Sequence, residues 1–184
     1  MSILPEPTSP EVIAKARSIK LLALDVDGVL SDGRLYFSAQ GDELKTFSTL
    51  DGHGIKLLQR HGIDVAIITG RNSPLVAKRA GDLQVRHLIQ GREDKLTALH
   101  EVLDPLGLSL SQAAYMGDDL PDLPAIRAAG LGMTVPNGYW LVRQHADWCS
   151  RAPGGMGAVR EACDLILDAQ GLLASVLDEY LPAL

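Results

Sequence analysis

The stretch LLALDVDGVLSDG, residues 21–33, decides the fold and raises the first question about function. Its apolar first half is typical of a buried strand, yet the run ends in two aspartates, Asp25 and Asp27, followed by Gly28. A buried carboxylate is costly unless it is paired or bound to a metal ion. Two carboxylates at the end of one strand therefore need a chemical reason.

Strand and helix patterns alternate along the rest of the chain. Apolar runs predict further strands at 63–70, 85–91, 113–119, 131–135 and 147–150. Helices are predicted at 9–16, from Asp51 as a cap to near Gly62, and at 73–81, 93–107, 121–130, 138–146 and 158–170. Apolar strands that alternate with helices are typical of a parallel sheet covered on both faces. Right-handed crossovers then give a doubly wound, Rossmann-like α/β fold.

The segment RLYFSAQGDELKTFS, residues 34–48, interrupts this alternation. Apolar and polar residues alternate on either side of QGD, which predicts a β-hairpin. No repeat or linker marks a second domain. We therefore expect one domain over residues 1–184, with the hairpin inserted at about 34–47 and a glycine-rich tail and helix at about 152–184.

The composition limits the possible partners. The 184 residues are 46% hydrophobic and carry a net charge of −6 with no basic run, which argues against nucleic acid. No apolar stretch approaches the ~20 residues that span a membrane, and the N-terminus lacks the pattern of a signal peptide. Cys149 and Cys163 have no metal-ligand spacing, so we interpret them as free core thiols in a reducing cytoplasm.

Polar residues gather where the predicted strands end. They are Asp25, Asp27, Thr69, Gly70, Arg71, Asp118 and Asp119, and Lys95 opens the helix after the strand at 85–91. Ligands of open parallel sheets bind at this edge. Two like charges about 4 Å apart cost about 4 kcal/mol at an effective dielectric of about 20. Mg²⁺ removes such a cost, because it prefers oxygen ligands and accepts one or two protein carboxylates. The absence of a His/Cys cluster disfavours zinc.

Four motifs occur in the order that is typical of the haloacid dehalogenase-like phosphatases: DVDGVLSDG, IITG, Lys95 and GDDLPD. With DGHGIKLL, QGREDKL and GGMGAVRE, the chain resembles the 3-deoxy-D-manno-octulosonate 8-phosphate (Kdo 8-phosphate) phosphatase family from residue 21 to about 171. The resemblance implies a Mg²⁺-dependent phosphomonoesterase that supplies Kdo for Gram-negative lipopolysaccharide. Two alternatives stay open: a phosphatase of another acidic nine-carbon sugar phosphate, and a non-catalytic assembly module of the same fold.

The resemblance also implies the roles of the motif residues. Asp25 is expected to attack phosphorus and form an aspartyl-phosphate. Asp27 is expected to protonate the leaving alkoxide and then to deprotonate the attacking water. The expected metal ligands are the carboxylates of Asp25 and Asp118 and the backbone carbonyl of Asp27. Thr69, Gly70 and Lys95 are expected to hold the phosphoryl oxygens.

Further residues are candidates for binding substrate. Arg71 and Arg79 suit the carboxylate or hydroxyls of the sugar. Asp119 is expected to support the metal or contact substrate, and Asp122 either to lie behind it or to cap a helix. Lys56 is either a substrate contact or a solvated lysine. The substrate loop STLDG comprises Ser48, Thr49, Leu50, Asp51 and Gly52, with Leu50 where some family members carry a basic residue.

The spacing of the motifs leaves no room for a lid domain. The long hairpin has an apolar face (Leu35, Phe37, Leu44, Phe47), which would be exposed in isolation. We infer that it packs against other subunits, and the resemblance implies a homotetramer in which neighbouring chains complete each site. The segment APGGMGAVRE either reaches toward a site, its own or a neighbour's, or is a plain glycine loop before a helix.

Overall fold

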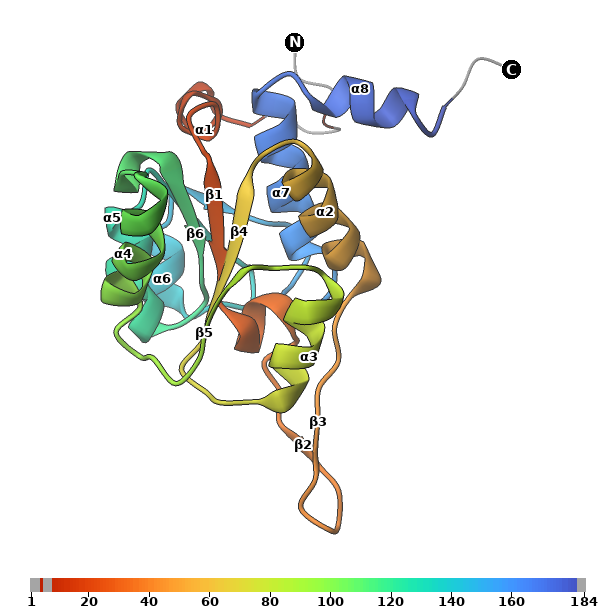
Figure 1. Ribbon diagram of the computed structural model, residues 1–184. Helices are drawn as coiled ribbons and strands as arrows, with labels where there is room; N and C mark the ends of the chain where they lie inside the picture. The colour runs from red at the N-terminus through yellow and green to blue at the C-terminus, as the bar shows by residue number, and fades with distance from the viewer. Residues whose placement is uncertain (1–3, 5–7, 182–184) are drawn as a thin grey trace.

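Six strands form one parallel sheet in the computed structural model, which describes residue 4 and residues 8–181 (Figure 1). The strands are β1 Leu21–Leu24, β4 Asp64–Ile68, β5 His87–Ile89, β6 Ala113–Met116, β7 Leu131–Thr134 and β8 Trp148–Cys149. Their spatial order is β5-β4-β1-β6-β7-β8. The chain therefore adds β4 and β5 on one side of β1. After β5 it crosses back and adds β6, β7 and β8 on the other side. The predicted doubly wound fold is confirmed.

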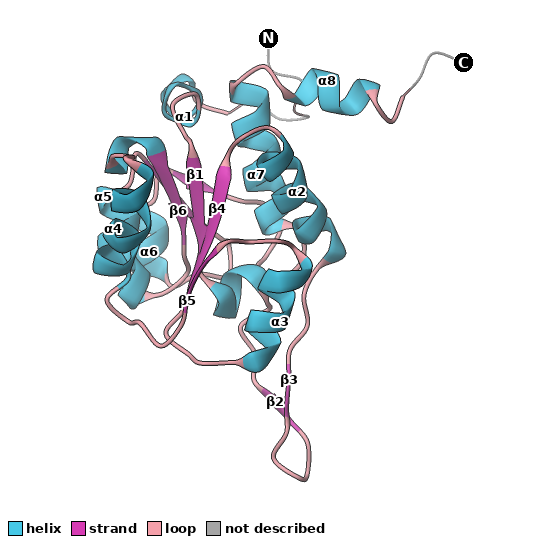
Figure 2. Ribbon diagram, viewed as in Figure 1, coloured by secondary structure: helices cyan, strands magenta, loops and turns pink. Residues whose placement is uncertain are grey.

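Helices cover both faces of this sheet (Figure 2). They are α1 Pro10–Ala16, α2 Thr49–Arg60, α3 Pro74–Asp82, α4 Lys95–Leu106, α5 Leu123–Ala128, α6 Trp140–His145, α7 Ala158–Ala169 and α8 Leu173–Asp178. Short helical turns occur at η1 Val26–Leu30, η2 Leu110–Gln112 and η3 Leu120–Asp122. None of the helices in the described ranges combines the length and the apolar character needed to cross a bilayer.

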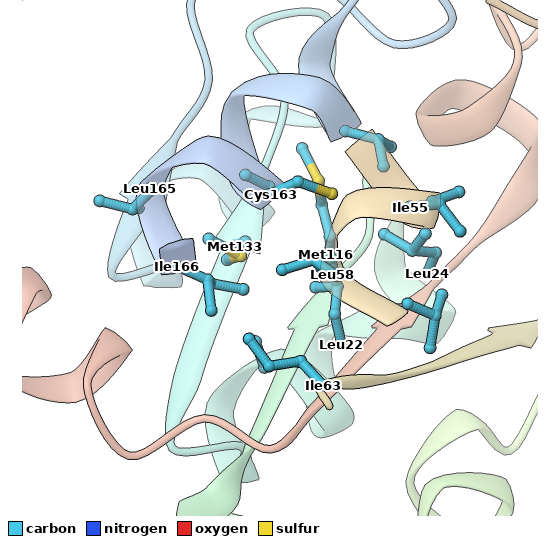
Figure 3. Packing of buried hydrophobic residues seen from close by; sticks show 14 of the residues in the cluster. Leu22, Leu24, Ile55, Leu58, Ile63, Met116, Met133, Cys163, Leu165 and Ile166 are labelled. Atoms are coloured by element: carbon cyan, nitrogen blue, oxygen red, sulfur yellow. The ribbon is translucent and has the colours of Figure 1, made fainter. Parts of the chain in front are cut away.

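The side chains on the two faces of β1 belong to two separate hydrophobic clusters. Leu22 and Leu24 point to the side of α2 and α7, where they join Ile55 and Ile166 (Figure 3). The alternate residues of β1 join the cluster that contains the buried residues of α4, α5 and α6. Burying one such leucine contributes about 1.5–3 kcal/mol. This two-sided burial explains why the strand is apolar at every position.

The predicted hairpin is present, although its paired strands are short. β2 Tyr36–Phe37 pairs antiparallel with β3 Glu43–Leu44, and the hairpin projects beyond the carboxyl edge of the sheet (Figure 1). Phe37 and Leu44 are each 61% exposed. Between β1 and β4 the described chain holds only η1, the hairpin and α2. It therefore has no lid domain at this insertion point.

Two local predictions are wrong. Asp51 does not cap α2, because the helix begins earlier and Ser48 Oγ accepts the backbone N–H groups of Leu50 and Asp51. The buried carboxylate of Asp51 instead accepts the backbone N–H of Arg160, at 2.9 Å. Cys149 is exposed rather than in the core, while Cys163 is buried; both are free thiols.

Candidate active site

Three neighbouring strands end at the site. Because β1 lies between β4 and β6 in the sheet, Asp25, Thr69 and Asp118 emerge side by side at its carboxyl edge. The sheet pairing continues into these residues: the Asp25 N–H donates to the carbonyl of Met116 at 3.0 Å. The strand order therefore brings together polar residues that lie far apart in the sequence.

The turn after β1 depends on Gly28. This residue has φ of 101°, a conformation that side chains disfavour. A Cβ on Gly28 would also overlap the carboxylate of Asp118. Glycine therefore lets the η1 turn and the loop after β6 approach each other closely.

Asp25, Asp118 and Asp122 form an acidic cluster. Each offers an oxygen within 4.8 Å of the others. Burial, and then the charges of Asp25 and Asp122, raise the pKa of Asp118 to about 8. Burial and the charge of Asp122 raise the pKa of Asp25 to about 7, although Lys95 opposes this shift. Among the described residues, buried Asp118 Oδ1 has no hydrogen-bond partner. These oxygens fit a hard divalent cation, as predicted for Asp25 and Asp118.

Lys95 lies at the centre of the site rather than in solvent. Its side chain is 4% exposed, and Nζ donates to Asp25 Oδ1 at 2.5 Å and to the carbonyl of Ile68 at 2.8 Å. Asp122 Oδ1 is 3.5 Å away. Lys95 is placed there because α4 begins at this residue, with Asp94 as its N-cap. The ammonium group thus partly compensates the acidic cluster.

Of the two roles left open for Asp122, the structure supports the one behind the Asp118–Asp119 loop. Its Oδ2 accepts the backbone N–H groups of Asp118 and Asp119, at 3.1 and 3.3 Å. The bond from Asp119 is half of a capping box at η3. Its Oδ1 accepts the hydroxyl of buried Tyr115 at 2.9 Å. Asp122 therefore braces the loop that carries Asp118, but its side chain makes no cap hydrogen bond to α5, the helix that it precedes.

The carboxylate of Asp27 is held by two cations. Lys45 forms an ion pair with Asp27 Oδ1, and Arg71 Nε lies 4.0 Å from Asp27 Oδ2. Lys45 was not identified from the sequence. The alternation of the hairpin does carry a signal, because Glu43 and Lys45 share one face and Leu44 occupies the other. Two charged residues on one face of this strand mark the face that turns toward the site. Phe37 pairs with Glu43, and Tyr36 pairs with Leu44. Phe37 therefore lies on the charged face, and the prediction of one apolar face that holds both Phe37 and Leu44 is wrong.

Thr69, Gly70 and Arg71 form the wall of the site that follows β4. Thr69 is buried, and its Oγ1 accepts the backbone N–H of Arg71 at 3.3 Å. Gly70 is exposed. The guanidinium of Arg71 reaches the hairpin, where Nη2 donates to Glu43 Oε1 at 3.2 Å. This wall therefore links the sheet edge to the hairpin.

Residues of the predicted substrate loop lie at the junction of the hairpin and α2. Arg79 Nη2 donates to the Ser48 carbonyl at 3.0 Å, and the Arg79 guanidinium lies over the ring of Phe47. Thr49 and Leu50 are exposed, whereas Gly52 packs against Arg79. In the described chain Arg79 thus stabilises the junction.

The other two predicted substrate contacts are Lys56 and Asp119, and only Asp119 lies beside the acidic cluster. Lys56 lines a hollow with Gln59 of α2 and with residues 84–86, which precede β5. That hollow lies at the amino edge of the sheet, whereas Asp25 lies at the carboxyl edge. Within one chain, Lys56 is therefore not close to Asp25. Asp119 is exposed and its carboxylate accepts the backbone N–H of Leu120 at 2.8 Å.

The glycine-rich segment packs against its own site loop. Gly155 N–H donates to the carbonyl of Val29 at 2.8 Å, and Gly154 N–H donates to Asn137 Oδ1 at 2.9 Å. A Cβ on Gly154 would overlap the carbonyl of Gly28. The segment therefore packs directly against the backbone of the η1 turn and stabilises it.

Known proteins share this fold and sequence. The profile of the haloacid dehalogenase-like hydrolases matches residues 34–130. The chain is 48% identical over 167 residues to the 3-deoxy-D-manno-octulosonate 8-phosphate phosphatase KdsC of Escherichia coli K12, covering 91% of this chain and 89% of that protein. The similarity thus extends well beyond the residues matched by the profile.

Two crystal structures are similar over almost their whole length. One, a probable yrbi family phosphatase from Pseudomonas syringae, has a TM-score of 0.93 and 53% identity, covering 96% of this chain and 100% of that chain. The other is the 3-deoxy-D-manno-octulosonate 8-phosphate phosphatase of Moraxella catarrhalis in complex with magnesium, phosphate and KDO. It has a TM-score of 0.92 and 48% identity, covering 94% of this chain and 99% of that chain.

Proposed function

We propose a function for this chain from one premise: it belongs to the haloacid dehalogenase-like hydrolases, in the family of the 3-deoxy-D-manno-octulosonate 8-phosphate phosphatases. The chain is a Mg²⁺-dependent phosphomonoesterase that hydrolyses Kdo 8-phosphate to Kdo and inorganic phosphate. It thereby supplies Kdo for lipopolysaccharide. The observation that carries this function is the buried contact of Asp25 with Lys95 beside Asp118, at the ends of adjacent strands.

The acidic cluster provides the metal site. The carboxylates of Asp25 and Asp118, with the backbone carbonyl of Asp27, would hold Mg²⁺, while Asp122 braces the Asp118 loop. When bound, the ion supplies positive charge that lets an anionic phosphate approach these carboxylates.

Asp25 and Asp27 divide the chemistry. Asp27 enters the reaction protonated. Asp25 attacks phosphorus, the bond from phosphorus to the sugar oxygen breaks, and the departing alkoxide takes the proton of Asp27, which becomes a carboxylate. Asp27 then takes a proton from water, whose oxygen attacks phosphorus. The bond to Asp25 breaks, its electron pair returns to the carboxylate, and inorganic phosphate leaves.

The phosphoryl oxygens are held by groups around Asp25. Lys95 supplies a fixed positive charge, and Thr69 with the backbone N–H of Gly70 supplies hydrogen bonds. Lys95 is already oriented by the Ile68 carbonyl, so little reorganisation is needed during the reaction. Arg71, which is 46% exposed beside Asp27, is the best candidate for the sugar carboxylate. Residues 48–52 and Arg79 form the neighbouring wall.

Hydrolysis of Kdo 8-phosphate tests this function directly. We expect the purified chain with Mg²⁺ to release phosphate from Kdo 8-phosphate faster than from nine-carbon acidic sugar phosphates. Asp25→Asn removes the nucleophile and should lower kcat by at least about 10³-fold. The control Asp82→Asn changes an exposed carboxylate on α3 and should leave kcat unchanged. Preference for a nine-carbon substrate would favour the first alternative, and no hydrolysis of any sugar phosphate would favour an assembly module.

We also infer that the chain works as a homotetramer in the cytoplasm. The exposed apolar side chains of the hairpin support the assembly, since they include Leu35, Phe37 and Leu44. Sites completed by neighbouring chains would take the place of a lid and exclude water during phosphoryl transfer. Two free cysteines suit a reducing compartment.

A further inference from the structure

Lys45 is a buried cation on an otherwise exposed hairpin. Its side chain is 2% exposed, whereas the neighbouring Leu44 is 61% exposed. An ammonium group so far from solvent is costly unless it is paired. Its partner is Asp27 Oδ1, and Glu43 Oε1 lies 3.9 Å away. The hairpin therefore presents its charge to the site and its apolar side chain to solvent.

The same carboxylate is approached from a second direction. Arg71 Nε lies 4.0 Å from Asp27 Oδ2, and Arg71 Nη2 donates to Glu43 at 3.2 Å. Two cations and two carboxylates thus form one network that joins the β1 loop, the β4 loop and the hairpin. Each oxygen of Asp27 faces a different cation. The ion pair with the buried ammonium of Lys45 restrains one oxygen of Asp27, and Arg71 adds a longer electrostatic contact at the other.

We propose that Lys45 is the positioning residue for Asp27. Through Lys45 the hairpin fixes the orientation in which Asp27 transfers its proton to the leaving group. The inference rests on the proposed function, in which Asp27 donates that proton. General acid–base catalysis contributes about 10²–10⁴-fold when the group is correctly placed. Loss of Lys45 should forfeit part of this factor, because Asp27 would lose the contact that orients it.

Leaving groups of different basicity separate this role from a structural one. Kdo 8-phosphate expels an alkoxide that needs a proton, whereas p-nitrophenyl phosphate expels a stable phenolate that does not. In Lys45→Met we expect kcat for Kdo 8-phosphate to fall about 10–100-fold with KM changed less than about threefold. First-turnover release of nitrophenolate should keep its rate within about threefold. Lys45→Arg should recover part of the lost kcat.

Lys78→Met is the matched control. Lys78 is 73% exposed, and it pairs with Asp82 one turn along α3. The same substitution there should leave both substrates unaffected. A crystal structure of Lys45→Met should also show the Asp27 side chain rotated from its present position.

Three results would overturn the inference. They are an unchanged kcat in Lys45→Met, an equal loss of both reactions, and an Asp27 side chain that keeps its position without Lys45. Failure of the proposed function would look different, because the wild-type chain would then be inactive or Asp25→Asn would remain active. In that case the crystal structure of Lys45→Met would still show whether Lys45 fixes the position of the Asp27 side chain.

Discussion

The charges of the acidic cluster do not balance within the chain. Asp25, Asp118 and Asp122 contribute three carboxylates, and Lys95 contributes one ammonium group. When all are ionised, two negative charges remain uncompensated at a site with little water. Burial and the mutual repulsion of these carboxylates raise the pKa of Asp25 and of Asp118, and a divalent cation would supply the missing positive charge.

This imbalance predicts how the metal-free chain responds to pH. The folded-state pKa of Asp118 is about 8 and that of Asp25 about 7, against ordinary values of 3.8. Between pH 4 and pH 8 the folded state therefore binds protons that the unfolded state has released. Stability should fall as pH rises through this window. Each kcal/mol lost lowers the melting temperature by about 2–4 °C.

Thermal unfolding in EDTA at pH 5.5 and pH 8.0 measures the effect. Other groups also titrate in this range, so the comparison is with Asp118→Asn, in which the fall should be smaller. Mg²⁺ at pH 8.0 should raise the melting temperature of the wild type and have little effect on the variant. An identical pH response in the two proteins would contradict this account of the cluster.

Among the elements, the glycine-rich segment and the η1 turn act as one unit. Gly154 lies so close to the Gly28 carbonyl that a methyl group cannot fit. Gly154→Ala should therefore displace η1, destabilise the fold by about 1–3 kcal/mol, and lower kcat because Asp25 and Asp27 flank this turn. Thermal unfolding and phosphate release measure the two effects.

Gly81 provides the control for this substitution. It lies within α3, and a methyl group at this position would meet no atom from another part of the described chain within 4 Å. Gly81→Ala should stabilise the chain by about 0.5–1 kcal/mol, since alanine is the better helix former. Equal effects of the two substitutions would show that packing behind η1 is unimportant.

Local patterns explain which elements could be predicted from the sequence. Buried strands are apolar on both faces, as in β1 and β6, and Ser9-Pro10 is a strong helix start that the structure confirms. The polar strand ends then indicate where the site lies. These signals depend only on neighbouring residues, so the fold and the position of the site followed from them.

Contacts between distant segments could not be predicted in this way. Asp51 resembles a helix cap by residue type, but its carboxylate binds the backbone of Arg160, 109 positions away. Lys45 resembles a solvated hairpin lysine, but its side chain is 2% exposed and pairs with Asp27 of the β1 loop. Such long-range pairing is set by the tertiary structure.

At the scale of the whole molecule, the order β4-β1-β6 places the site where the chain reverses direction across the sheet. Loops diverge at such a point and leave room for a ligand. The hairpin beside this opening has short paired strands and carries exposed apolar side chains. It is therefore suited to pack against another copy of the chain, which would then help to enclose the substrate.

Removing apolar side chains from the hairpin tests this assembly. Phe37 and Leu44, each 61% exposed, should be buried in the proposed tetramer, and burying such a side chain contributes about 1.5–3 kcal/mol. Phe37→Ser combined with Leu44→Ser should shift sedimentation from tetramer to smaller species and raise KM for Kdo 8-phosphate about tenfold or more. Leu181→Ser is the control, because Leu181 is 74% exposed. It follows α8, which lies at the end of the molecule opposite the hairpin (Figure 1). A wild-type chain that sediments as a monomer with full activity would rule out completion of the site by neighbouring chains.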